Sequence, residues 1–157
     1  MTNSTIFGNS TETVNSSAGG GIHSSETINL VNCTVTGNTS LIGGGLVSNG
    51  AAFSIKNTLV ALNTASTGFD VNGQFASNGY NLIGRRDSAT GFNGATEITG
   101  TNASPRAPGL ETNGGGAPVL ADNGGTTKTV ALVAGSAAID KGAAQTGVTT
   151  DQRGIER

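Results

Sequence analysis

The sequence has few of the residues from which most binding and catalytic sites are built. It contains no tryptophan, one cysteine, one histidine and three prolines in 157 residues, and only 11% of its residues are charged. The single cysteine, Cys33, excludes an internal disulfide. The eight lysines and arginines are scattered along the chain, and nucleic-acid binding needs clustered basic side chains. We therefore expect no nucleic-acid partner.

Long apolar runs are also missing. No segment approaches the roughly 20 apolar residues of a membrane-spanning helix. The N-terminus lacks the basic and apolar stretch of a signal peptide. We expect no membrane span in this chain, and we interpret the chain as a piece of a longer protein whose export signal lies outside it.

Glycine, in contrast, is abundant at 26 residues, and the chain repeats itself. The segments NSTIFGN, NCTVTGN and NTLVALN, at residues 3–9, 32–38 and 57–63, align without gaps. Each begins and ends with asparagine and has an aliphatic residue at its centre. The first asparagine column is Asn3, Asn32 and Asn57, the second is Asn9, Asn38 and Asn63, and the aliphatic column is Ile6, Val35 and Val60.

Two further segments recur in each period of about 25 residues. One is GGGI, GGGL and GFDV at residues 19–22, 43–46 and 68–71. The other pairs Ile28 and Leu30 with Phe53 and Ile55, and then with Tyr80 and Leu82. Apolar residues at the i, i+3 and i+4 spacing of a helical solenoid are absent.

The repeat predicts an all-β fold, a parallel β-helix of about three coils with three short strands per coil. Stacked coils place like residues on like residues, so aliphatic columns fill the interior and asparagine columns form hydrogen bonds along the stack. Glycine fits where the backbone has positive φ or approaches its neighbour closely.

The period fails after Arg86, and the following segment holds all three prolines. We therefore divide the chain into β-helix coils at residues 1–87 and a C-terminal cap at residues 88–157. The first coil has no such cap. This predicts self-association through its unpaired edge.

Four segments of the second half carry a resemblance to a known family: NGYNLIG (78–84), LADNGGTTKT (120–129), LVAGSAAIDKG (132–142) and TDQRG (150–154). With the preceding coils, they resemble the choice-of-anchor Q domain family. The resemblance implies a right-handed β-helix near the C-terminus of a large bacterial protein that is secreted or held at the cell surface. It implies architecture and location, and no reaction.

Parallel β-helices often carry polysaccharide lyases and hydrolases, whose sites need paired carboxylates or a carboxylate cluster that holds Ca²⁺. The ten acids of this chain, Glu12 among them, do not recur at one strand position. Asp70 takes the position of Gly21 and Gly45, without an acid beside it. We expect no catalytic, cofactor-binding or metal-binding residues. The alternative is a calcium site formed by Asp122, Asn123 and a carbonyl.

The remaining candidates have structural interpretations. His23 has no companion ligand, and Cys33 falls in an inward-facing column, so we expect an ordinary polar side chain and a buried small one. We expect Arg153 to bind Asp140 or Asp151 and so to hold the end of the cap together.

One surface invites a binding hypothesis. Thr5, Thr34 and Leu59 form an outward column with Phe7, Thr36 and Ala61 beside it, and such a face fits a polysaccharide. We expect a structural or adhesive segment without catalysis, whose partner is a polysaccharide or another surface protein. The alternative is a carbohydrate-active enzyme or a carbohydrate-binding remnant of one, which would bring two or more carboxylates together on one face.

Overall fold

The computed structural model describes residues 1–11, 18–50 and 52–157. Every regular element in these residues is a short β-strand, and the strands form three parallel sheets. The first sheet has the order β1 (Thr5–Phe7), β4 (Thr34–Thr36), β7 (Leu59–Val60), β10 (Leu82–Ile83) and β11 (Ile98–Thr99). The second comprises β2 (Ile22–Ser24), β5 (Leu46–Ser48) and β8 (Val71–Gly73), and the third β3 (Ile28–Val31), β6 (Phe53–Lys56) and β9 (Ala76–Ser77).

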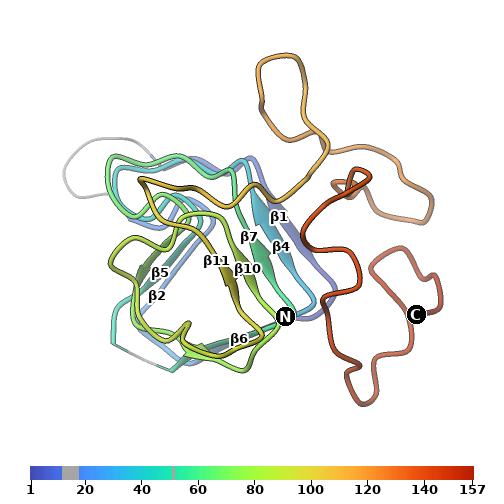
Figure 1. Cartoon of the computed structure of the whole chain (residues 1–157), viewed down its shortest axis with the longest axis horizontal. Coiled ribbons are helices and arrows are strands. Elements are labelled where there is room, and N and C mark those ends of the chain that lie inside the picture. Colours follow the sequence, from blue (N-terminus) through green and yellow to red (C-terminus); the bar gives the residue numbers. More distant parts are fainter. Residues whose placement is uncertain (12–17, 51) are drawn as a thin grey trace.

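The chain passes through the three sheets in rotation, so each round places its strands beside those of the round before (Figure 1). This arrangement is β-helix-like. Ile6 lies opposite Val35, and Val35 opposite Val60, as the repeat predicts. Ile22, Leu46 and Val71 are in register in the second sheet.

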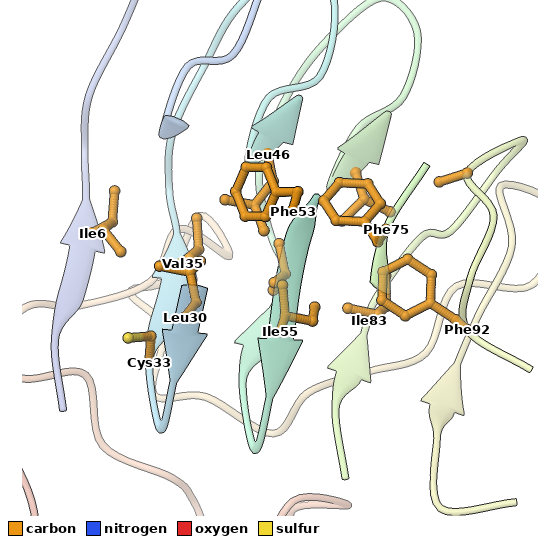
Figure 2. Close-up of a cluster of buried hydrophobic side chains, with 13 residues drawn as sticks. Ile6, Leu30, Cys33, Val35, Leu46, Phe53, Ile55, Phe75, Ile83 and Phe92 are labelled. Carbon is orange, nitrogen blue, oxygen red and sulfur yellow. The ribbon is translucent and has the colours of Figure 1, made fainter. Parts of the chain in front are cut away.

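The core is the narrow interior between the sheets (Figure 2). Its aliphatic columns are fully buried at Val35, Val60 and Ile83. Three phenylalanines stack from round to round, with ring centroids 5.1 Å apart for Phe53 and Phe75 and 5.3 Å apart for Phe75 and Phe92. Such tilted aromatic pairs add stability beyond the apolar area that they bury.

The repeated glycines lie where neighbouring rounds approach most closely. A Cβ atom on Gly20 would lie 2.6 Å from the carbonyl oxygen of Gly44, and one on Gly21 would lie 2.6 Å from that of Gly45. No side chain fits at such a distance, so these positions require glycine.

The third round differs from the sequence alignment. We predicted Tyr80 and Leu82 as its third-sheet segment, and this was wrong: Leu82 pairs with Leu59 in the first sheet. The third-sheet strand is β9, with Ser77 opposite Ile55, and Phe75 supplies the aromatic ring of this round. The round is shorter than the two before it, so a fixed period misplaces its last strand.

The stack also continues past residue 87. Strand β11 pairs with β10, Thr90 bridges Gln74, and Phe92 joins the buried core. After Gly100 the described residues form only isolated bridges, all of them antiparallel. This segment lies against the flank of the stack beside the first sheet, where Figure 1 shows it in orange and red.

The covered flank overturns one expectation. The Thr-bearing column was predicted to face solvent, yet Thr36 and Ala61 are fully buried and Leu59 is 8% exposed. Leu110 and Val130 of the C-terminal segment pack against Leu59 and Ala61. Apolar residues on the outer side of the sheet need such a cover, because leaving them in water is unfavourable.

The described part of the chain contains no helical segment with the length and apolarity that a bilayer crossing requires.

Candidate functional site

The second asparagine column forms a ladder of hydrogen bonds through the interior. The backbone N–H and the side-chain amide of Asn9 both donate to Asn38 Oδ1, at 2.9 and 3.0 Å. Asn38 donates in the same two ways to Asn63 Oδ1, at 3.0 and 2.9 Å. The Asn38 amide also donates to the carbonyls of Ile6 and Thr36. Asn38 is fully buried, so these bonds satisfy an amide that burial would otherwise destabilise.

Asp70 ends this ladder. The backbone and side-chain amides of Asn63 both donate to Asp70 Oδ1 at 3.0 Å, and the backbone N–H of Arg85 donates to Oδ2 at 2.7 Å. The residue is 1% exposed. Burial raises the pKa of its carboxyl to about 6, although the three N–H donors and the Arg85 charge act in the opposite direction. Because N–H groups occupy both oxygens, the carboxylate acts as a structural acceptor.

The first asparagine column lies at a corner where the backbone is left-handed. Asn3, Asn32 and Asn57 have φ values of 48°, 54° and 50°, and Tyr80 follows them in the next round with φ 61°. Asparagine tolerates this conformation better than most side chains. The Asn57 amide donates to Asn32 Oδ1 at 2.9 Å, so this column also bonds between rounds.

The same corner holds the C-terminal segment. Asn57 donates to the carbonyl of Ala143 at 2.7 Å and accepts from the Ala143 N–H at 3.0 Å. The Asn3 amide donates to the Thr150 carbonyl, and Arg157 donates to Asn3 Oδ1. This column therefore attaches residues 143–157 to the stack.

Arg153 binds Asp151, and the sequence had left Asp140 as the other choice. Its Nε and Nη2 donate to Asp151 Oδ2 at 2.9 and 2.7 Å, and Nη1 donates to the Asn123 carbonyl at 3.0 Å. Burial acts to raise the pKa of the Asp151 carboxyl, but the hydrogen bonds from Arg153 and Ile155 and the Arg153 charge hold that pKa below its ordinary value. Asp140 lies elsewhere, with φ 56°, in the wall of the cleft described next.

Two hollows lie between the stack and the C-terminal segment. The larger, of about 880 Å³, has Leu59, Leu82 and Ile98 of the first sheet on one side and Leu110 and Val130 on the other. This hollow is a part of the contact between the first sheet and the C-terminal segment that side chains do not fill completely.

The smaller hollow, of about 630 Å³, is lined by Leu62, Phe69, Arg85 and Arg106 together with threonine, glycine and proline residues. We call it the arginine groove. The Arg85 guanidinium lies 4.4 Å from the centre of the Phe69 ring, a distance typical of cation–π contact. This groove could not be predicted from the sequence, because its two arginines lie in segments that share no repeat.

The other candidates lie apart. His23 is on the outer side of β2, and its Nε2 lies 3.0 Å from Asn49 Nδ2. Cys33 is buried, and burial raises the pKa of its thiol, which favours the unreactive form. In the described residues no three His, Cys, Asp or Glu side chains gather as metal ligands, and Glu12 lies outside those residues. Asp122 Oδ1 accepts the Gly124 N–H, and the Asn123 amide donates to the Thr129 carbonyl.

Comparisons with protein-family models, with curated proteins and with solved structures find no match to this chain.

Proposed function

We propose that the chain is a non-catalytic structural and adhesive segment of a larger bacterial protein that is secreted or held at the cell surface. The observation that carries the proposal is the ladder from Asn9 to Asp70, which is buried from Asn38 onward. Its amides bond one round to the next, and the buried Asp70 carboxylate joins Asn63 to Arg85 of the following round. A rigid spacer needs this kind of internal support.

The resemblance to the choice-of-anchor Q domain family supports the location and belongs to the same proposal. We infer a right-handed β-helix for the stack, since connections between parallel strands of one sheet are right-handed in nearly all proteins. A crystal structure with left-handed coils would contradict this, and antibodies against the chain that fail to label intact source cells would contradict the location.

Self-association through the first round is part of the proposal. Among the described residues, strands β1 and β2 each pair on one side only, whereas Thr2 bridges the outer edge of β3. An unpaired strand edge can accept another strand. A monodisperse monomer at high protein concentration in light scattering would argue against it.

The first test is a polysaccharide panel that measures binding and the release of reducing or unsaturated ends, with and without Ca²⁺. Binding without release supports an adhesive segment. If neither binding nor release is detected, the structural role as a spacer remains and the adhesive role is rejected. Release of ends would replace the proposal with a carbohydrate-active enzyme.

A further inference from the structure

The arginine groove runs across successive rounds at one corner of the stack. Its lining includes Gly37, Leu62 and Gly84, which lie shortly after strands β4, β7 and β10. Thr39 and Thr64, which bridge each other, also line it. Pro105, Pro108 and Pro118 of the C-terminal segment contribute to the same lining. The groove therefore lies between two parts of the chain that are far apart in the sequence.

Two guanidinium groups lie at this groove. The Arg106 N–H donates to the Gly84 carbonyl at 2.8 Å, which places Arg106 beside the segment that carries Arg85. The only ion pair within the described residues joins Arg153 to Asp151, so neither groove arginine has an acidic partner there. The lining also contains the Asp70 carboxylate, which binds backbone and amide donors. Two guanidinium groups against one carboxylate leave the groove with an excess of positive charge, in a chain of net charge −2.

Asp70 positions one of these arginines. Its bond to the Arg85 N–H fixes the backbone, and the Phe69 ring supports the guanidinium from one face. An arginine held in this way has lost part of its conformational freedom before a ligand arrives, which lowers the entropic cost of binding.

The remaining lining suits a hydroxyl-rich ligand better than a protein. Protein interfaces depend on aromatic and apolar anchors that fill pockets. Here the Phe69 ring is already covered by Arg85, and most of the other lining residues are small: glycine, alanine, threonine and proline. Leu62, 36% exposed at φ 58°, is the one large aliphatic side chain of this lining.

We propose that the arginine groove binds an acidic polysaccharide, with Arg85 and Arg106 each binding a carboxylate of a uronic acid unit. Guanidinium and carboxylate groups match in a planar, two-bond geometry. This inference rests on the adhesive part of the proposed function and supplies its site and ligand class.

The test measures binding of the whole chain to three oligosaccharides of equal length by calorimetry: oligogalacturonate, an uncharged glucan and a sulfated glucan. We expect oligogalacturonate to bind most tightly and to weaken as salt is added, because exposed charges are screened. Arg106→Gln and Arg85→Gln should each weaken this binding by about tenfold, as expected when one charge-assisted contact is lost. Lys128→Gln, at an exposed cation outside the groove, is the matched control and should bind as the wild type does.

Arg106 is exposed, so its variant should fold even if Arg85→Gln loses stability with its ring contact. Unchanged binding by Arg106→Gln, equal binding of the uncharged glucan, tighter binding of the sulfated glucan, or no binding of oligogalacturonate would each overturn the inference. None of these outcomes involves release of chain ends, which is the result that would overturn the non-catalytic function itself.

Discussion

Asp70 shows how one side chain can close a repeat. Its sequence position matches Gly21 and Gly45, where neighbouring rounds leave no space: a Cβ on Gly45 would lie 2.8 Å from the Asn63 amide nitrogen. At Asp70 a side chain is accommodated, and its carboxylate accepts the bonds that a further asparagine would otherwise accept. The sequence marked this position as an exception to the glycine column, but only the hydrogen bonds explain the exception.

The raised pKa of Asp70 predicts a pH-dependent stability. A folded-state pKa of about 6, above the ordinary aspartate pKa of 3.8, means that the folded protein binds the proton more tightly than the unfolded chain. This stabilisation is fully present below pH 4 and is lost as pH rises through 6, by about 3 kcal/mol. Asp70→Asn should remove this part of the pH dependence, as measured by urea unfolding between pH 4 and 7.

The exposed Asp122→Asn is the control for this experiment. Equal slopes for Asp70→Asn and the wild type would contradict the prediction. Asp151 acts with the opposite sign: its lowered pKa gives stability that is present above the ordinary aspartate pKa and is lost as pH falls through its folded-state value. Asp70→Asn, Asp122→Asn and the wild type all retain Asp151, so its contribution to the pH dependence is the same in all three proteins.

Thr36 predicts a stabilising substitution. It is fully buried on β4, and its hydroxyl has no hydrogen-bond partner. Valine has nearly the same shape and suits a strand, so Thr36→Val should raise the free energy of unfolding by about 1 kcal/mol. Thermal and urea unfolding would measure this, and a loss of stability would show that the hydroxyl is satisfied in solution.

At the scale of the element, no strand is stable alone, because the strands are only two to four residues long. Stability comes from the columns that join the rounds, chiefly the ladder. Asn38→Ala would remove the bonds to Asn9 and Asn63 and leave buried carbonyls without donors. We expect a loss of about 3 kcal/mol in urea unfolding. Asn102→Ala, at an exposed asparagine, should change stability little, and equal effects would contradict the ladder's role.

The columns also explain how much of the fold could be predicted. In the first-sheet segments of the first three rounds, asparagine and aliphatic residues occupy the same places within each seven-residue segment, so the register of Ile6, Val35 and Val60 follows from the alignment. The third round is shorter. Phe75 stacks on Phe53 and so keeps the aromatic ring of this column, but Ser77 lies opposite Ile55 and breaks the aliphatic pattern. The local sequence therefore did not indicate that Leu82 belongs to a first-sheet strand.

At the scale of the whole molecule, the flank of the stack carries a second core. Leu59 and Leu82 face outward from the first sheet and pack against Leu110 and Val130. The C-terminal segment has no repeat and lies far along the chain from the sheet that it covers. Its contact with the first sheet, and the arginine groove beside that contact, therefore could not be predicted from the sequence. The sequence predicted a C-terminal cap at residues 88–157; in the structure β11 still pairs with the stack, and the segment after Gly100 packs against its flank.

This arrangement predicts that the cap separates before the stack unfolds. Its isolated bridges and small apolar contact should protect the amides of Ala121 and Thr129 less than the core amides of the stack in hydrogen exchange.

The flank contact also predicts the effect of two leucine substitutions on stability. Leu110→Ala should lower the free energy of unfolding by about 2 kcal/mol, since it opens a cavity in the flank contact, whereas Leu132→Ala, at a 42% exposed leucine, should lower it much less. Equal costs, or equal protection of cap and stack, would contradict the prediction.

The ladder also gives the array a direction of growth. Each amide nitrogen donates toward the following rung and each amide oxygen accepts from the preceding one, so the amide dipoles align head to tail. The donor end meets a carboxylate, a group that needs no further acceptor. Strands β10 and β11 continue the stack after Asp70, so the carboxylate ends the ladder and not the stack. At the other end, the amide of Asn9 has the right polarity to extend the ladder by a further rung.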